Sequence, residues 1–321
     1  APQFLARQVV GDVTPQTGDL NMGADQPATS APLGAVGAIA VIALSIAVGA
    51  AIAAGASHNA MTLFDVPLPW IALVVAFVFQ WVAFVPAYRE QTEHYYDLTG
   101  SLTYLAVVML ALFGGARDPR SLLLAVLVVI WAVRLGTFLF QRVRRAGSDG
   151  RFDEIKRSAP RFLVAWTVQG LWVFLTLAAV IGAMTGAAPT PLAPLDALGV
   201  LIWSLGFGIE VIADRQKSRF RASHPTGFIE SGLWSWSRHP NYFGEILLWT
   251  GIAIVAASTL AGWQWVTMIS PVFVAFLLTM VSGIPLLEQR ADARWGEDAR
   301  YRSYKARTST LVPMPPSRAA T

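Results

Sequence analysis

Residues with the capacity for chemistry are concentrated between positions 206 and 245, in the stretch GFGIEVIADRQKSRFRASHPTGFIESGLWSWSRHPNYFGE. Glu210 and Asp214 are four residues apart, so on a helix their carboxylates share one face. The cations that follow them are Arg215, Lys217, Arg219 and Arg221. Such a concentration of positive charge suits a polyphosphate ligand. The alternatives are a flank that stops membrane insertion and a surface that binds anionic lipid.

A second group of polar residues precedes the next apolar run. Arg238 and His239 are followed by Pro240, which is favoured at the first position of a helix. A helix N-terminus beside an arginine is an anion site, because its backbone N–H groups have no partners within the helix. The run itself begins with Asn241, Tyr242 and Glu245. An acid at the depth of Glu245 is costly unless it is paired, so it is either a functional group or the buried partner of Arg238.

The C-terminal segment, residues 287–313, again mixes basic and aromatic side chains. Its candidates are Arg290, Tyr301, Tyr304 and Lys305, with Glu288, Arg294 and Arg307 close by in the sequence. Arginine and tyrosine together can bind phosphates and stack on a nucleotide base. The alternative is an amphipathic helix that lies on the bilayer.

Residues 88–105 place further ionisable groups at a membrane boundary. The candidates are Glu93, Tyr96, Asp97 and Tyr104. A tyrosine beside a carboxylate can act as a proton donor with an orienting partner. Interfacial tyrosines more often belong to an aromatic belt, although Tyr104, about two turns into the next apolar run, fits a belt less well.

The elements that must position these residues are membrane-spanning helices. The chain has 321 residues, of which 55% are hydrophobic and 14% are charged, and its mean hydropathy is +0.51. A soluble domain carries about 25% charged residues. We therefore predict an all-α, polytopic membrane bundle of about eight helices, since lipid offers the backbone no hydrogen-bond partners. The predicted spans are 33–55, 66–87, 98–115, 120–140, 162–185, 194–213, 242–258 and 263–284.

The domain organisation follows from this pattern. Residues 1–32 are rich in Pro, Gly, Thr and Gln and are predicted to form a mobile tail before a single membrane domain, 33–321. With eight spans, 21 of the 24 Lys and Arg residues fall on one side of the membrane. The excess of basic residues on cytoplasmic segments then predicts that both termini are cytoplasmic.

Several classes of site are disfavoured. The chain has no cysteine and only four histidines without HExxH spacing, so no metal site is expected. It has no GxGxxG motif after a strand, so a Rossmann domain is not expected either. The net charge of +4 is interpreted as a record of membrane orientation, and nucleic acid is not an expected partner.

The C-terminal motifs resemble those of the membrane steroid 5-alpha-reductase and sterol reductase superfamily, especially its bacterial branch. The resemblance lies in ADRQKSRFRA, GLWSWSRHPNYFGEI and the closing Y-x-x-Y-K before LVP, and it covers roughly the last 120 residues. The element R-H-P-x-Y also occurs in the isoprenylcysteine carboxyl methyltransferases. The combination of motifs is therefore more specific than this element alone.

The resemblance implies a seven-helix reductase core with one extra helix and an NADPH site mainly within 206–313. Family cofactor positions correspond to Asp214, Arg221, Asn241, Glu245 and Tyr304, and Glu210 stands where the steroid reductases have Asn. Together with the residue-based candidates, the predicted cofactor residues are Glu210, Asp214, Arg219, Arg221, Arg238, His239, Asn241, Tyr242, Glu245, Arg290, Tyr301, Tyr304 and Lys305. The family's catalytic Glu and Tyr come from the second span and the segment after it, where Tyr104, Tyr96, Glu93 and Asp97 are the candidates.

The expected activity is NADPH-dependent reduction of a carbon–carbon double bond conjugated to a carbonyl in a steroid-like or other hydrophobic lipid. The substrate is expected to enter from the bilayer, the protein to be monomeric, and the membrane to be a bacterial inner membrane, or the endoplasmic reticulum in a eukaryote. Three alternatives remain open. They are a methyltransferase that uses S-adenosylmethionine, a non-enzymatic lipid-binding or transport protein and, with less support, a sterol isomerase.

Overall fold

The computed structural model describes residues 34–146, 152–187 and 191–315, and helices make up almost all of this part of the chain. The predicted tail, 1–32, lies outside the described residues. The helices are α2 (Ala35–Ala56), α3 (Leu68–Arg89), α4 (Tyr96–Gly114), α5 (Pro119–Ala146), α6 (Ala159–Thr176), α7 (Ala178–Thr185), α8 (Pro194–Ser223), α9 (Pro240–Ala257), α10 (Ile269–Phe276), α11 (Ile284–Trp295) and α12 (Ala299–Arg307). The strands β1 (Thr62–Leu63) and β2 (Val66–Pro67) form a short antiparallel hairpin between α2 and α3.

The chain is a multi-pass membrane protein with an all-helical bundle. In the described part, six helical segments are long and apolar enough to cross a membrane, and the bent pair α6–α7 makes a seventh. The two helices of this pair meet at an angle of 52°, within the segment predicted as the span 162–185. The predicted span 242–258 is α9, which begins with polar residues, is 18 residues long and is not among these seven segments. A helix of that length extends about 27 Å, close to the thickness of the hydrocarbon core.

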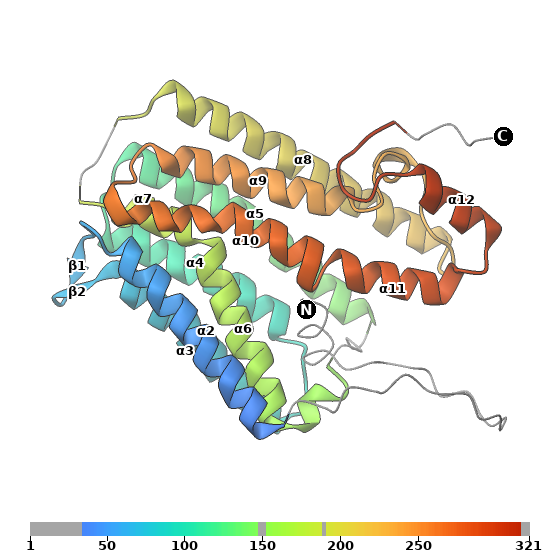
Figure 1. The fold of residues 1–321 in the computed structure, drawn as a ribbon, viewed down its shortest axis with the longest axis horizontal. Coiled ribbons are helices and arrows are strands. Elements are labelled where there is room, and N and C mark those ends of the chain that lie inside the picture. The colour runs from blue at the N-terminus through green and yellow to red at the C-terminus, as the bar shows by residue number, and fades with distance from the viewer. Residues whose placement is uncertain (1–33, 147–151, 188–190, 316–321) are drawn as a thin grey trace.

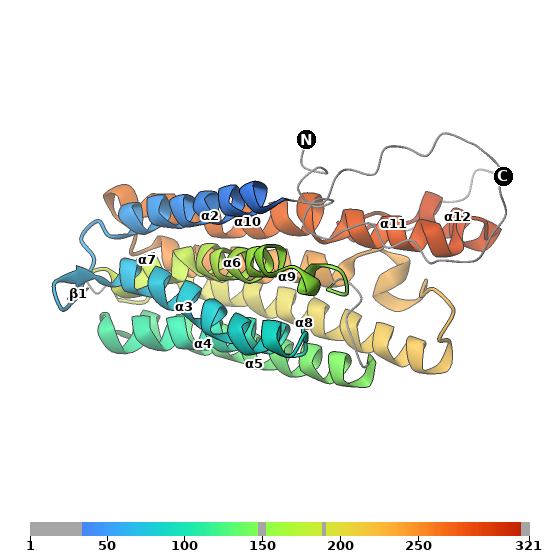
Figure 2. The ribbon, with the colours of Figure 1, turned by 90° about the horizontal axis from the view of Figure 1, so that it is seen from below.

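The helices form three layers. Figure 2 shows α6, α7 and α9 between a layer that contains α2 and α10 and a layer that contains α3, α4, α5 and α8. Burial agrees with this arrangement, because all eight residues of α7 are buried and α9 is buried along most of its apolar part. A helix in a middle layer contacts protein on two sides, which explains why α7 is apolar throughout.

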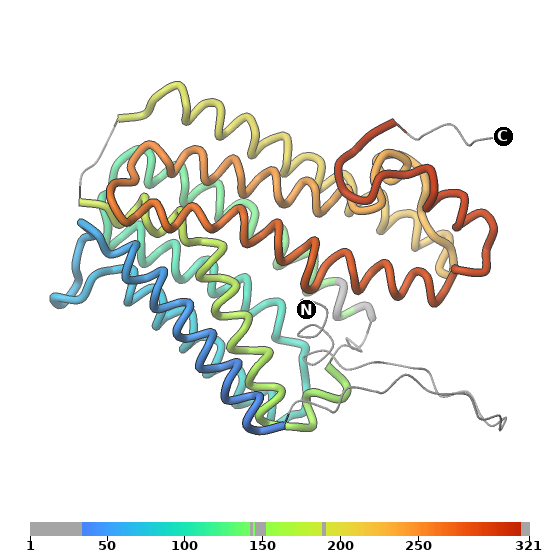
Figure 3. Tube along the Cα trace, viewed as in Figure 1, coloured from blue at the N-terminus to red at the C-terminus, as the bar shows by residue number. Residues whose placement is uncertain are grey.

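The basic segments meet at one end of the bundle. The Cα trace in Figure 3 shows α8 and α9 running antiparallel, with the 224–239 connection and the C-terminal segment at the same end. Helix α8 continues to Ser223, ten residues beyond the predicted end of its span. The arginine-rich sequence after Asp214 is therefore helical, and its residues project from α8 at helical spacing.

Glycines set the close approach of α8 and α9. Gly206 faces Gly244, and a Cβ added to Gly206 would lie 2.6 Å from the Gly244 carbonyl oxygen. Gly199 and Gly251 form a second such contact, where a Cβ added to Gly251 would lie 2.6 Å from the Gly199 oxygen. Small residues at this spacing let two membrane helices bring their backbones together.

Two arginines connect the parallel helices α5 and α8. Arg120 is buried and donates to both carboxylate oxygens of Asp196 at 2.8 Å. Two heptads further along the same helix, Arg134 donates to Glu210 and Asp214. Each arginine is thereby neutralised within the bundle, which offsets the cost of placing charge among apolar helices.

We predict that Gly206→Ala lowers the stability of the bundle, because the new methyl group meets the backbone of α9 and the helices must separate. Overpacking of this kind costs about 1–3 kcal/mol. Gly208→Ala is the matched control, since no atom lies within 4 Å of a Cβ at this position on the same helix. Thermal unfolding of both variants in detergent, followed by tryptophan fluorescence, measures the difference. Equal stability of the two variants would show that the α8–α9 contact does not require glycine.

Candidate functional site

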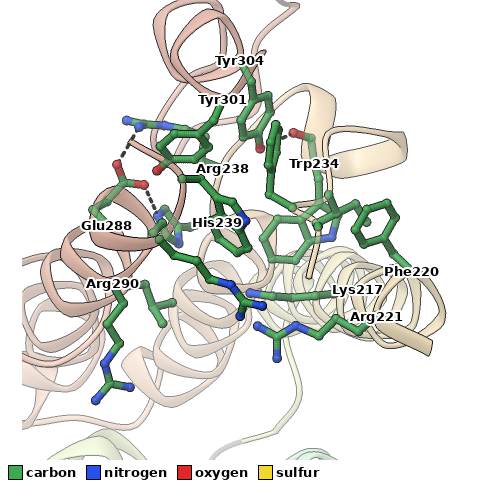
Figure 4. A pocket seen from close by; sticks show the side chains of 17 residues that line it. Lys217, Phe220, Arg221, Trp234, Arg238, His239, Glu288, Arg290, Tyr301 and Tyr304 are labelled. Atoms are coloured by element: carbon green, nitrogen blue, oxygen red, sulfur yellow. Dashed lines mark hydrogen bonds and ion pairs between the residues drawn. The ribbon is translucent and has the colours of Figure 1, made fainter. Parts of the chain in front are cut away.

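A cavity of about 290 Å³ opens at the basic end of the bundle, between the end of α8, the 224–239 connection, α11 and α12 (Figure 4). Its lining is rich in cations and aromatic rings. The lining residues are Lys217, Phe220, Arg221, Gly227, Phe228, Ile229, Trp234, Arg238, His239, Leu287, Glu288, Arg290, Ala291, Arg294, Trp295, Tyr301 and Tyr304.

Hydrogen bonds to backbone atoms hold the walls of the cavity in place. The indole N–H of Trp234 donates to the Ala213 carbonyl at 3.1 Å and fixes the connection against α8. The Tyr304 hydroxyl donates to the Trp234 carbonyl at 2.8 Å, so α12 is held against the same connection. The connection can turn here because Gly232 adopts φ +64°, a conformation that favours glycine.

The cavity carries an excess of positive charge. Five of its lining residues are Lys or Arg, and Glu288 is its one acidic lining residue. Glu288 is itself neutralised, because it accepts from Arg238 at 2.6 Å and lies 2.9 Å from His239 Nε2. Lys305 adds a further positive charge beside Glu288, since its Nζ lies 3.3 Å from Glu288 Oε2 and donates to Asp292 Oδ1 at 2.6 Å. The lining as a whole holds five basic residues and one acidic residue, and this excess of positive charge favours an anionic ligand.

Two pairs of cations line the cavity from different helices. Lys217 and Arg221 are four residues apart on α8, and Arg290 and Arg294 are four apart on α11. Residues at this spacing share a helix face. Like charges brought to one cavity repel each other, and an anion with several negative oxygens relieves that repulsion.

Aromatic rings supply the rest of the lining. The rings of Phe228 and Tyr304 are stacked, with centroids 5.8 Å apart. The Lys217 ammonium lies 4.5 Å from the centroid of Trp234, and the Arg294 guanidinium lies 5.0 Å from that of Trp295. Flat apolar faces beside cations can stack on a heteroaromatic base while its phosphates bind the charges.

Burial changes the pKa of several groups here. Burial lowers the pKa of His239; Glu288 opposes this shift, and the nearby Lys217 and Arg238 add to it. Burial raises the pKa of Tyr301 and of Tyr304, so both hydroxyls stay protonated and act as donors at neutral pH. His239 is thus held as a neutral imidazole whose Nε2 faces Glu288.

A second polar cluster lies deeper, between α5, α8 and α9. Its centre is Arg134, which bridges Glu210 and Asp214. Glu245 of α9 interacts electrostatically with all three of these residues. Among the described residues, Glu210 Oε2 is buried without a hydrogen-bond partner. A buried orphan acceptor is costly, and it points to a ligand or water that completes the cluster.

Aromatic residues pack in the core of the same helices. Tyr104 of α4 makes an edge contact with Trp131, with ring centroids 5.0 Å apart, and its ring lies 6.1 Å from that of Trp249. Tyr104 is also within electrostatic range of Glu245. In the described part of the chain, the indole N–H of Trp249 is buried without an acceptor. This region therefore combines a buried hydroxyl, a carboxylate and an unsatisfied donor.

The predicted cofactor residues occupy several positions. Those that line the cavity are Arg221, Arg238, His239, Arg290, Tyr301 and Tyr304, and Lys305 pairs with Glu288 beside it. Those in the deeper cluster are Glu210, Asp214 and Glu245. Tyr242 stacks on His239, with ring centroids 5.7 Å apart. Arg219 faces a different groove, between α5 and α8, and Asn241 is half-buried in the first turn of α9.

Of the predicted catalytic residues, Tyr104 is separated from the other three. Glu93 is buried and accepts from Lys156 at 2.8 Å. The Tyr96 hydroxyl donates to the Ala165 carbonyl at 3.0 Å, and its ring packs against Phe152 and Trp166. Asp97 lies in the first turn of α4. Tyr104 is within electrostatic range of Glu245 and lies about 12 Å along α4 from Tyr96.

The sequence pattern did not indicate a role for Arg134 or for the phenylalanine and tryptophan residues of the lining. The signal for Arg134 was its position, since it is a basic residue inside a predicted span, and such residues need an acidic partner. The signal for Phe220, Phe228, Trp234 and Trp295 was their place beside basic residues. Which ring faces the cavity depends on the fold of the 224–239 connection, and periodicity does not reveal it.

Fold and site together define a multi-pass membrane protein with a cationic, aromatic cavity at one end of its helical bundle. The chain belongs to the family described as "Protein of unknown function (DUF1295)", whose model matches residues 83–308 and so includes both the cavity and the deeper cluster. This family includes steroid 5-alpha-reductase-like membrane proteins.

One curated protein is similar to part of this chain. "Uncharacterized protein C594.04c" of Schizosaccharomyces pombe is 24% identical over 177 residues, which is 45% of this chain and 51% of that protein. The match thus spans about half of the relative's length. No solved structure matches the chain.

We predict that acidification destabilises the protein through His239. Because the folded-state pKa of His239 is lowered, the unfolded chain binds its proton first, and stability is lost as the pH falls through about 6.5, the ordinary histidine value. A single group of this kind contributes at most about 1.4 kcal/mol per pH unit. His239→Gln should flatten the fall in thermal stability between about pH 7.5 and 5.5.

His224→Gln is the control, because His224 is exposed at the end of α8. It should leave the pH dependence as in the parent protein. An unchanged pH dependence in His239→Gln would show that other groups cause the acid sensitivity.

Proposed function

We propose that the protein is an NADPH-dependent reductase of a carbon–carbon double bond conjugated to a carbonyl in a hydrophobic lipid. The observation that carries the proposal is the cavity with five cations and several aromatic rings at the end of a membrane bundle. Membership of a family that includes steroid 5-alpha-reductase-like proteins supports it.

The cavity suits the phosphorylated adenosine half of the cofactor. Its volume of about 290 Å³ is close to the lower limit of ligand pockets, about 300 Å³, and so fits one nucleotide rather than a whole dinucleotide. The pairs Lys217–Arg221 and Arg290–Arg294 offer charge for the pyrophosphate and the 2′-phosphate. Trp234, Tyr301 and Tyr304 offer aromatic faces for the base.

The deeper cluster suits the reactive half. Helix α8 leads from Arg221 to Glu210, eleven residues or about 16 Å along one helix. Near its inner end Glu210 Oε2 is without a hydrogen-bond partner in the described part of the chain, and the N–H of a carboxamide can donate to such an acceptor. When bound, NADPH supplies a hydride for the double bond.

The chain's own residues would then handle the proton. Tyr104 is buried and protonated at neutral pH as an ordinary phenol, and it can donate a hydrogen bond to a carbonyl oxygen that gains negative charge. Glu245, within electrostatic range, is the group that would orient it. The surrounding tryptophans keep water from this part of the core.

A methyltransferase that uses S-adenosylmethionine is the second candidate, because the sequence Arg238–Tyr242 carries an R-H-P-x-Y element. S-adenosylmethionine has no phosphate groups, and the cavity has two pairs of cations. The charge of the cavity therefore favours the reductase, and a comparison of the two ligands in one binding assay separates the candidates.

We predict that Arg221→Ala weakens NADPH binding more than NADH binding, because this guanidinium is offered to the 2′-phosphate. The loss of one charge-assisted hydrogen bond costs about 1.5–3 kcal/mol, or about 10- to 150-fold in Kd. Quenching of tryptophan fluorescence measures both constants, since Trp234 and Trp295 line the cavity. Adenosine 2′,5′-bisphosphate should bind the same site and 5′-AMP more weakly, because the cavity holds the adenosine half.

Arg219→Ala is the matched control on the same helix, since this exposed residue does not line the cavity. It should bind NADPH as the parent does. Equal weakening of NADPH and NADH by Arg221→Ala would remove the 2′-phosphate assignment. Quenching by S-adenosylmethionine but not by NADPH would overturn the reductase and support the methyltransferase.

We predict that Tyr104→Phe lowers turnover of NADPH with an enone lipid by about 10²- to 10⁴-fold, the usual contribution of a positioned acid. Binding of adenosine 2′,5′-bisphosphate should be unchanged, because the cavity does not include Tyr104. Tyr96→Phe is the control, since its hydroxyl already donates to Ala165. Full activity of Tyr104→Phe would show that another group protonates the substrate.

A further inference from the structure

A groove of about 680 Å³ lies on the outer side of the bundle between α5 and α8. Its lining differs from that of the cavity, because most of it is aliphatic and its cations are at one end. The lining residues are Val129, Ile130, Val133, Arg134, Thr137, Phe138, Gln141, Val211, Asp214, Arg215, Ser218 and Arg219.

Arginine bridges connect α5 and α8 beside this groove. Arg120 joins the two helices at one end and Arg134 joins them near the middle. The Arg134 guanidinium also lies 5.3 Å from the ring centroid of Phe138, so it forms part of the wall of the groove. Long side chains that bridge two helices leave room beside them.

The apolar wall faces outward. Ile130 and Val133 are 44% and 51% exposed, on a helix that is long and apolar enough to cross a membrane. The lining residues of α5 extend from Val129 to Gln141, about 18 Å of helix. That length is similar to the depth of one hydrocarbon leaflet, about 15 Å. A single acyl chain aligned with α5 would therefore lie along the groove.

The polar end of the groove is cationic. Arg215 and Arg219 are exposed and one turn apart on α8, with Gln141 and Ser218 beside them. Asp214, the acid in this lining, is already engaged by Arg134. Two arginines one turn apart match the oxygens of a phosphate, which can accept hydrogen bonds from both.

We propose that this groove binds an anionic phospholipid, with one acyl chain against Val129, Ile130 and Val133 and the headgroup phosphate at Arg215 and Arg219. The groove is distinct from the cavity described above and does not depend on the proposed reductase activity. It differs from a general basic surface, because it joins an apolar channel of leaflet length to two cations at one end.

The test is native mass spectrometry of the full chain, titrated in detergent with phosphatidylglycerol or with phosphatidylcholine of the same acyl chains. The parent protein should retain phosphatidylglycerol preferentially. Arg215→Ala/Arg219→Ala should weaken phosphatidylglycerol binding about 30-fold, because each of the two basic residues near a membrane surface contributes about 1 kcal/mol. Val133→Trp should fill the groove and lower retention of the same lipid by a similar factor.

Val126→Trp is the matched control for the groove, since this exposed valine lies two turns away on the same helix and outside the lining. It should retain phosphatidylglycerol as the parent does. Thr137→Trp replaces Val133→Trp if the latter does not yield a monodisperse protein. Equal retention of the two lipids by the parent would overturn the proposal. Loss of preference in the arginine variant but not in either tryptophan variant would also overturn it, because charge alone would then explain the binding.

Discussion

The contact between α8 and α9 is the constraint on which the cavity depends. Gly206 and Gly244 bring the two backbones together near the middle of the bundle, and Gly199 and Gly251 repeat the contact one heptad away. Helix α8 then carries Lys217 and Arg221 to the basic end, while α9 starts there just after Arg238 and His239. Because the glycines set the distance between the two helices, they also set the distance that the 224–239 connection must span. Trp234 of this connection donates a hydrogen bond to the Ala213 carbonyl of α8 and so holds the connection against that helix. A wider spacing of these helices would move the cations of α8 away from those that precede α9.

Basic residues are neutralised by acidic residues within the helical bundle, whereas they are in excess in the cavity at its basic end. Within the bundle, Arg120 is matched by Asp196, and Arg134 is matched by two carboxylates. This pairing is what the low dielectric demands, because an unpaired ion among apolar helices is costly. In the cavity, cations outnumber acids and Glu288 is shared between Arg238 and His239. The buried arginines are thus neutralised by carboxylates of the protein, whereas the cavity keeps an excess of basic residues. This contrast favours a negatively charged ligand in the cavity.

The sequence was sufficient for the helices and for the position of the basic end, because apolar runs of membrane length have few other interpretations. The sequence also predicted that Glu210 and Asp214 lie on one face of a helix, because they are four residues apart. The sequence did not predict which charged residues form ion pairs with one another. Glu245 was weighed as the partner of Arg238, but Arg238 pairs with Glu288, and Arg134 engages the carboxylates of α8. These contacts join residues 50 and 76 positions apart, and only the packing of the helices decides them. The bend between α6 and α7 was missed for a similar reason, because both halves are equally apolar.

In the proposed function, the relation between the cavity and the deeper cluster would limit how a dinucleotide binds. Both lie along α8, but Tyr104, Trp131 and Trp249 pack against one another in the core that a reactive ring must approach to reach Glu245. A ligand can enter tightly packed aromatic residues only if their side chains change rotamer, and a change of rotamer requires space beside the ring. Trp249 is on α9, one turn beyond Glu245, so its movement is coupled to the α8–α9 contact that glycine sets. If, in the proposed reductase, the adenosine half of the cofactor binds first at the basic end, its binding energy would be available to displace these rings. Until then the aromatic cluster would exclude water from the proposed site of hydride transfer.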